Sequence, residues 1–356
     1  MRGFLEIRWN NIQSSLKDLE VDAFIVTSKA NHRYFTGFDN PDGALLFLKD
    51  KKFAFEDFRY SEVACEYIGA DFTIFESSLD VERLNVIVKS EGIKTIGFEG
   101  SMGYSLYERL SKSIDAELVS KGSFADTARE VKDPYEIEKI AIAQEITDGA
   151  FAHILRIITP NMTENDVAAE LEYYMRKHGA EDKSFETIAV SGEKSSLPHG
   201  TPSDTSLKKG FLTMDFGEVY EGYHADMTRT ICIGKANAEI KELYNTVLKA
   251  QLSVLDMLRD GVACADADKV AIDIIDENYK RCFGHSLGHG VGLEIHEQPN
   301  LSKYSKKILK PGNVVTVEPG IYIPKKYGCR IEDLVLIQEG NIRNFTKGTK
   351  ELIEIY

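Results

Sequence analysis

Four acidic residues lie in two apolar segments of the second half of the chain, at spacings suited to binding metal ions. Asp215 and Asp226 flank a polar turn in LTMDFGEVYEGYHADMTRTICIG, and Glu318 and Glu332 flank another in TVEPGIYIPKKYGCRIEDLVLI. Each segment has the pattern of a β-hairpin, because two β-rich runs are joined by a turn containing Gly or Pro. Carboxylates on otherwise apolar strands repel one another and resist desolvation unless cations neutralise them. The pattern therefore predicts a metal site.

The position of each turn determines which acids face each other. A turn centred between residues 220 and 221 is expected to place Asp215 opposite Asp226. A turn centred on Lys325 pairs the two acids of the second segment in the same way. Side chains that are opposite on antiparallel strands are close enough to share one ligand. Each hairpin is therefore predicted to contribute one pair of acids to the site.

Histidines near the acidic segments add nitrogen donors. His289 lies in the glycine-rich run GHSLGHGVGLEIHE, whose glycines allow the backbone to approach a bound group closely. His296 lies near the end of the same run, and His199, in LPHGTP, precedes the first hairpin. A single histidine is more often a structural residue, and His199 alone is equally consistent with an exposed loop position. Two imidazoles beside an acidic hairpin indicate one shared pocket.

The composition excludes several classes of protein. The 356 residues, 43% of them hydrophobic, suffice for two globular domains with separate cores. The formal net charge of -14 argues against a nucleic-acid partner. Five scattered cysteines without a C-x-x-C pair are typical of reduced thiols in a cytoplasmic protein. We find neither a signal-peptide pattern nor an apolar run of ~18 residues, so we expect a soluble cytoplasmic chain without a membrane partner.

The remaining sequence predicts two domains that position these residues. Residues 1–125 alternate strand-like runs with helical stretches, which is typical of an α/β domain. A helix is predicted to begin after Asp133, with Pro134 in its first turn and Glu136 completing a capping box, so we assign the second domain to residues 126–356. In this domain the order helix, helix, hairpin occurs twice, which suggests two related halves around a central site.

In these motifs the chain resembles the pita-bread metallopeptidases, the family of methionine aminopeptidase, aminopeptidase P and prolidase. The two acidic hairpins and the glycine-rich run are similar to the metal motifs of the family, and NHRYFTGF and DFRYSEVA to motifs of its creatinase-like N-terminal domains. The resemblance covers nearly the whole chain. It implies an α/β creatinase-like domain followed by an α+β pita-bread catalytic domain with an internal pseudo-two-fold repeat. It also implies a homodimer.

The resemblance implies a role for each site residue. The ligands of two adjacent divalent cations are expected to be Asp215, Asp226, His289, Glu318 and Glu332. Asp226 and Glu332 would bridge the cations, and Glu318 would also move a proton. His199 and His296 would stabilise the substrate carbonyl and the tetrahedral intermediate.

The role of Arg330 and the preferred metals are inferred from strand position and from ligand chemistry. Arg330, two residues before a metal-binding acid, is expected to orient an acid, although an exposed salt bridge is the alternative. Two cations would lower the pKa of a bound water and polarise the scissile carbonyl. Four carboxylates and one imidazole are mostly hard ligands, so Mn or Co is favoured over Fe or Zn.

The expected substrates are proline-containing dipeptides or short peptides, cleaved at the bond before proline. Some dipeptidases of the family place an arginine just after H-E-x-P, where this chain has Asn300, so Lys303, Lys306 or Lys307 would have to bind the proline carboxylate. The alternative is an aminopeptidase P, which releases the N-terminal residue from longer Xaa-Pro peptides. A metal-free creatinase-like hydrolase and a non-catalytic binding module are disfavoured, because all five ligand positions are filled.

Overall fold

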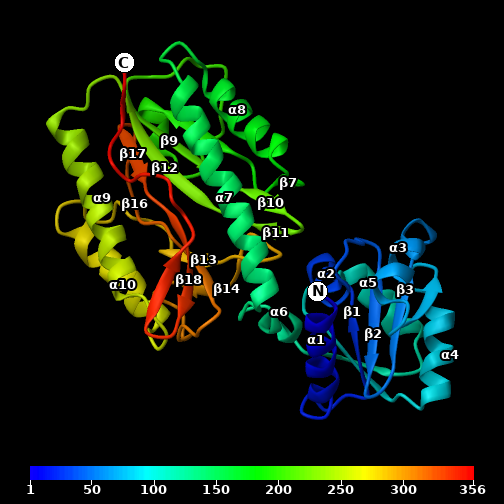
Figure 1. Cartoon of the computed structure of the whole chain (residues 1–356). Coiled ribbons are helices and arrows are strands. Elements are labelled where there is room, and N and C mark those ends of the chain that lie inside the picture. The colour runs from blue at the N-terminus through cyan, green and yellow to red at the C-terminus, as the bar shows by residue number, and fades with distance from the viewer. The chain divides into compact units, whose positions relative to one another are not determined.

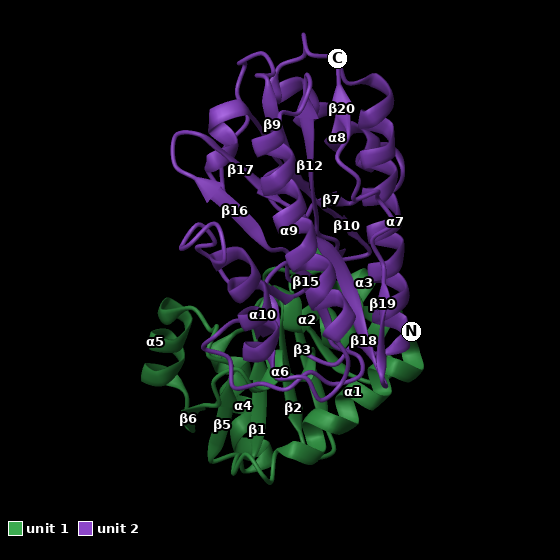
Figure 2. Cartoon of the chain, turned by 90° about the vertical axis from the view of Figure 1, so that its left-hand side faces the viewer, with its two compact units in different colours: residues 1–129 green, residues 130–356 purple.

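The computed structural model describes residues 1–356, which form two compact units (Figure 1, Figure 2). The first unit is Met1–Arg129 and the second is Glu130–Tyr356. Helix α6 (Phe124–Ala128) is the last element of the first unit. None of the helices combines the length and the apolar character that crossing a membrane would require.

The first unit has the predicted α/β architecture. Its six-stranded sheet has the order β4-β3-β2-β1-β5-β6. The strands are β1 (Ala23–Val26), β2 (Ala44–Leu48), β3 (Lys52–Glu56), β4 (Thr73–Glu76), β5 (Thr95–Phe98) and β6 (Glu117–Ser120). The other helices are α1 (Arg2–Ser15), α2 (Lys29–Thr36), α3 (Phe58–Ile68), α4 (Val81–Glu91) and α5 (Tyr104–Ser113). Every residue of β1 and β2 is buried, so these central strands are covered on both faces.

The second unit begins with the helix that the capping box predicts. Helix α7 (Pro134–Ile157) has Asp133 as its N-cap, and the side chains of Asp133 and Glu136 bond each other's backbone N–H groups. Helix α8 (Glu164–Lys177) follows. Three antiparallel strands come next: β8 (Ile188–Ser191), β9 (Gly210–Phe216) and β12 (Met227–Ile233). The short β20 (Glu354–Ile355) completes a sheet with the order β20-β12-β9-β8.

The same order of elements recurs in the second half of this unit. Two helices, α9 (Ala238–Met257) and α10 (Cys264–Asp276), precede a five-stranded sheet with the order β14-β13-β15-β18-β19. Its strands are β13 (Gly288–Gly290), β14 (Glu297–Leu301), β15 (Val314–Val317), β18 (Asp333–Gln338) and β19 (Asn341–Asn344). Figure 1 shows the helices of the unit on the outside and the strands of both sheets between them. This arrangement supports the predicted repeat.

Shorter elements extend the two acidic hairpins. They are β7 (Asp182–Lys183), the 3-10 helix η1 (Gly192–Ser196), β10 (Glu218–Tyr220), β11 (Tyr223–His224), β16 (Gly320–Ile323) and β17 (Tyr327–Arg330). β10 and β11 continue β9 and β12 towards the first turn, and β16 and β17 lie between β15 and β18.

The register of the first hairpin differs from the prediction by two residues. Thr228, and not Asp226, lies opposite Asp215. The reason is a two-residue turn at Glu221 and Gly222, both with positive φ (45° and 79°), as in the type I′ turns that match strand twist. Because the side-chain period of a strand is two, this shift keeps Asp215 and Asp226 on one face of the sheet as diagonal neighbours.

The register of the second hairpin agrees with the prediction. Val317 pairs with Asp333, and Gly320 pairs with Arg330, so the positions between them bring residues 318 and 332 opposite each other. The chain turns at residues 324–326, where the central residue, Lys325, has a φ of 59°. The two acids of this hairpin therefore face each other directly.

Candidate active site

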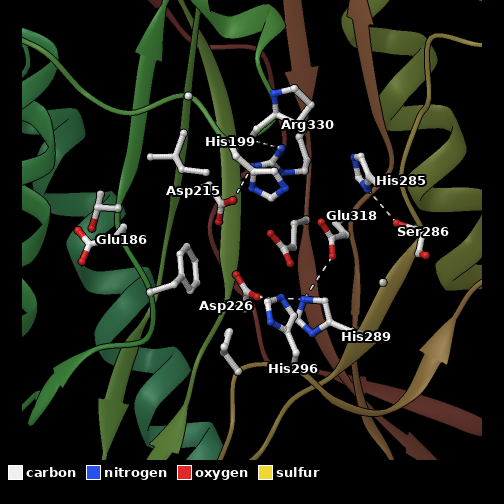
Figure 3. Close-up of a pocket in the computed structure, with 18 of the residues that line it drawn as sticks. Glu186, His199, Asp215, Asp226, His285, Ser286, His289, His296, Glu318 and Arg330 are labelled. Atoms are coloured by element: carbon white, nitrogen blue, oxygen red, sulfur yellow. Dashed lines mark hydrogen bonds and ion pairs between the residues drawn. The ribbon is translucent and has the colours of Figure 1, made fainter.

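A pocket of about 660 Å³ lies in the second unit and contains every residue that the sequence selected as a metal ligand or a catalytic residue. Those residues are His199, Asp215, Asp226, His289, His296, Glu318, Arg330 and Glu332. Figure 3 shows the carboxylates in the centre of this pocket, with His199 on one side of them and His296 on the other. Acids that are up to 117 residues apart in the sequence thus share one cavity.

The two hairpins meet at the acids. Asp215 lies on β9 and Asp226 directly precedes β12, whereas Glu318 directly follows β15 and Glu332 lies between β17 and β18. The backbone N–H of Glu332 donates to the carbonyl of Thr228 at 3.1 Å, which joins the second hairpin to the first. The hydroxyl of Thr228 donates to Oε2 of Glu332 at 2.6 Å. One residue therefore fixes both the main chain and the carboxyl of this acid.

His289 presents a nitrogen to the acids. Its Nε2 lies 3.5 Å from Oδ2 of Asp226 and 3.4 Å from Oε1 of Glu318. Its Nδ1 lies 3.0 Å from the carbonyl oxygen of Gly290, which can only accept, so we assign the proton to Nδ1 and a free lone pair to Nε2. Burial lowers the pKa of His289 to about 4, which keeps the ring neutral as a metal ligand requires.

The chemistry of the donor set fits divalent cations. Asp226, His289 and Glu332 each offer one ligand atom, and these atoms lie within 4.8 Å of one another. Burial raises the pKa of Asp226 and Glu332 well above ordinary carboxyl values, and the neighbouring carboxylates raise both further. Burial also raises the pKa of Glu318 to about 8. Oδ1 of Asp215 is buried without a hydrogen-bond partner. Cations would offset this repulsion and give that oxygen a partner.

Arg330 is buried and bonds an acid, so the exposed salt bridge considered as its alternative is wrong. Only 2% of the residue is exposed, and its guanidinium bonds Oδ2 of Asp215. It also donates to the hydroxyl of Thr228 at 2.9 Å and to the carbonyl of Pro198 at 3.3 Å. No other arginine or lysine lines the pocket. Its position is therefore set by several contacts at once.

Sequence reasoning missed two residues of the site, His285 and Tyr322. His285 lines the pocket, and its Nε2 lies 3.0 Å from the hydroxyl of Tyr322, which in turn accepts a hydrogen bond from Arg330 at 2.6 Å. Burial lowers the pKa of His285 to about 4, and the charge of Arg330 acts in the same direction. The signal for His285 was present, since it stands four residues before His289 in the glycine-rich run. Tyr322 lies in an apolar strand run that gives no such signal.

The structure does not bring the expected lysines to the pocket. Asn300 lines it, but Lys303, Lys306 and Lys307 do not. Lys307 forms an ion pair with Glu130 instead. The pocket therefore has no lysine for a proline carboxylate.

The fold and this site define a class of protein: a two-domain enzyme whose second domain has a candidate metal site between acidic hairpins. Comparison with known families specifies the class. The creatinase/prolidase N-terminal domain matches residues 8–131, and metallopeptidase family M24 matches residues 138–339. The chain belongs to metallopeptidase family M24, and its second unit is a pita-bread catalytic domain.

Individual relatives extend the match over nearly the whole chain. An Xaa-Pro dipeptidase from Pyrococcus horikoshii is 37% identical over 343 residues, which are 94% of this chain and 95% of the relative. The solved structure of an Xaa-Pro dipeptidase from Bacillus anthracis has a TM-score of 0.95 at 38% identity, covering 99% of this chain and 100% of that one. An X-Pro aminopeptidase from Thermotoga maritima has a TM-score of 0.89 at 37% identity, covering 96% and 100%. These similarities confirm the resemblance and the fold class predicted from the motifs.

Proposed function

We propose that this metallopeptidase hydrolyses the peptide bond before proline in Xaa-Pro dipeptides, with two divalent cations as cofactors. The observation that carries the proposal is the convergence of four carboxylates and His289 in one pocket of a family M24 chain. Relatives named Xaa-Pro dipeptidase supply the substrate class. The mostly hard donor set favours Mn or Co over Fe or Zn.

The ligands of the cations are the five donors that the motifs indicate. They are Asp215, Asp226, His289, Glu318 and Glu332. Asp226 and Glu332 belong to different hairpins and offer ligand atoms within 4.8 Å of each other and of His289, so these two acids would serve both cations, as the resemblance implies. Bound cations lower the pKa of a water and polarise a carbonyl as Lewis acids.

The surrounding side chains orient these groups and handle protons. The hydroxyl of Thr316 donates to Oε1 of Glu318 at 3.1 Å and accepts from the backbone N–H of His289 at 3.0 Å, so one threonine holds both residues. Glu318 accepts a proton from the attacking water and transfers it to the leaving nitrogen. His199 and His296 lie on opposite sides of the acids and donate to the developing oxyanion.

The substrate pocket suits a proline ring better than a free carboxylate. Phe185, Ile188 and Ile295 line it and offer apolar contact to a ring that has no N–H to recognise. At the position where some dipeptidases have an arginine stands Asn300, which is neutral and exposed. This observation favours one second candidate, an aminopeptidase P acting on longer Xaa-Pro peptides, and a relative named X-Pro aminopeptidase agrees with it.

One rate series tests the proposal. Purified protein supplied with Mn²⁺ or Co²⁺ is assayed on Ala-Pro, Met-Pro and their Gly-extended tripeptides, with Ala-Gly as the control. We expect both Xaa-Pro dipeptides to be cleaved faster than the tripeptides, and Ala-Gly not to be cleaved. Faster cleavage of the tripeptides would favour the aminopeptidase, and no cleavage of any Xaa-Pro bond would contradict both candidates. A homodimer and a cytoplasmic location stay predictions.

A further inference from the structure

The connection between β8 and β9 forms one wall of the pocket and carries His199. Five consecutive residues of this connection, 198–202, line the pocket. The connection contains only the short helix η1, and His199 itself is exposed. Burial therefore does not fix the imidazole, and its position depends on what holds the connection at its two ends.

Glu164, the first residue of α8, bonds the connection on both sides of His199. It is 1% exposed. On the N-terminal side, its Oε1 accepts from the backbone N–H of Ser191 at 2.8 Å, and its Oε2 accepts from Nζ of Lys194 at 2.6 Å. On the C-terminal side, Oε2 accepts from the hydroxyl of Ser203 at 2.9 Å. One buried carboxylate thus ties together residues that lie before and after the imidazole.

The N-terminus of α8 holds the same connection through its backbone. The first N–H groups of a helix have no partner within the helix. Here the N–H of Glu164 donates to the carbonyl of Thr205, and that of Asn165 to the carbonyl of Ser203, each at 3.1 Å. The side-chain amide of Asn165 donates to Asp204 at 2.7 Å. The C-terminal side of the connection is therefore anchored to the helix independently of the carboxylate.

The second acidic hairpin holds the opposite side of the connection. The hydroxyl of Ser195 accepts from the N–H of Gly328 on β17 at 3.0 Å. A Cβ at Gly328 would clash with the carbonyl oxygen of Ser195, so the close approach of the two backbones requires glycine here. Arg330, on the same strand, bonds the carbonyl of Pro198, the residue before His199. The connection is therefore fixed between α8 and the strand that leads to the acids.

We propose that Glu164 is a positioning residue that holds His199 against the substrate carbonyl. The inference rests on the proposed function, in which His199 donates to the oxyanion. The carboxylate does not line the pocket, and its bonds go to Ser191, Lys194 and Ser203, so it acts by fixing the ends of the connection. A displacement of about 1 Å at a catalytic group can lower the rate by about 100-fold, so the loss of this tie should be measurable as activity.

Glu164→Gln tests the proposal, because the amide keeps the shape but replaces one acceptor oxygen with a donor. We expect kcat/KM on Met-Pro to fall about 10- to 100-fold with unchanged metal content. We expect His199→Ala to cost about 100-fold or more, and Glu164→Gln to cost nothing further in that background. Amide hydrogen exchange in residues 192–206 should be faster in Glu164→Gln.

The matched control is Asp166→Asn, two residues after Glu164 in the first turn of α8. Its exposed carboxylate accepts from the N–H of Thr163 at 2.7 Å, within the capping box of α8. We expect wild-type kcat/KM and wild-type exchange in residues 192–206. Equal changes in this control would mean that any damage to the start of α8 has the same effect, which would contradict a specific role of Glu164.

Several results would overturn the positioning role. If Glu164→Gln lowers kcat/KM by the same factor in the wild-type and His199→Ala backgrounds, Glu164 does not act through His199. Wild-type activity of His199→Ala would overturn the role as well, while leaving dipeptide cleavage intact. If Glu164→Gln does not fold, Lys194→Met and Ser203→Ala each remove one of its contacts and should cost less, again only when His199 is present. If the wild-type protein cleaves no Xaa-Pro bond, the proposed function is contradicted instead. Amide hydrogen exchange in residues 192–206 then still tests whether Glu164 fixes the connection.

Discussion

Arg330→Met removes the one arginine or lysine that lines the acidic pocket. In the folded chain this guanidinium bonds Asp215, whose other carboxyl oxygen is already without a partner, and it also bonds Thr228 and Tyr322. Breaking a buried ion pair on one side costs about 3–5 kcal/mol, since the remaining charge stays buried. At about 2–4 °C per kcal/mol for a unit of this size, the melting temperature should fall by at least about 6 °C in metal-free protein.

The metal dependence of this loss separates the proposed role from simple loss of packing. If cations bind the acids, they also neutralise Asp215, so the loss in melting temperature should be smaller in Mn²⁺ than in EDTA. Lys326→Met is the matched control, because Lys326 lies on the exposed turn of the same hairpin, and its ion pair with Glu239 of α9 is at the surface and should contribute little to stability. The assay is the melting temperature of both variants, measured by thermal unfolding in EDTA and in Mn²⁺. The reasoning would be refuted if Arg330→Met did not lower the melting temperature, or lowered it equally in EDTA and in Mn²⁺.

Three further predictions concern the chemistry, a buried acid and the specificity of the same unit. His296→Ala should keep its metal content while kcat falls about 100-fold or more, and loss of metal would instead make His296 a ligand. Burial and the charge of Glu181 raise the pKa of Glu218 to about 8, so this carboxyl stays protonated in the folded chain between about pH 4.5 and pH 8 but ionises in the unfolded chain, and the wild type loses stability over this range. Glu218→Met should therefore be more stable than wild type by a margin that grows from about pH 4.5 to pH 8 in urea unfolding, and a pH-independent margin would contradict it. Asn300→Arg should lower the KM for Ala-Pro about 10-fold without a similar effect on Ala-Pro-Gly, and equal effects on both peptides would show that the arginine does not reach the proline carboxylate.

The motifs located the pocket because acids on apolar strands are costly without cations, which is a property of residue type and spacing. That reasoning selected Asp215 and Asp226 but assigned their register wrongly. A turn at Glu221 and Gly222 requires positive φ at a glutamate, which the sequence pattern does not favour. The error shifted the pair by two residues and left both acids on the face that points into the pocket.

Residues that act through side-chain contacts were harder to predict. Tyr322 lies in an apolar strand, and its link between His285 and Arg330 depends on hydrogen bonds that no spacing reveals. Glu164 is 35 residues from His199 and follows an ordinary N-cap threonine, so its sequence context indicates only the start of a helix. The lysines near Asn300 were predicted from sequence proximity alone, and their side chains lie outside the pocket.

Metal content tests the account most directly. We propose two cations per chain, bridged by Asp226 and Glu332, so elemental analysis of protein dialysed against Mn²⁺ should give two ions for the wild type. Asp226→Asn should lose both ions and all turnover, because the removed carboxylate would serve both. Two retained ions with normal cleavage of Met-Pro in this variant would contradict the proposed centre.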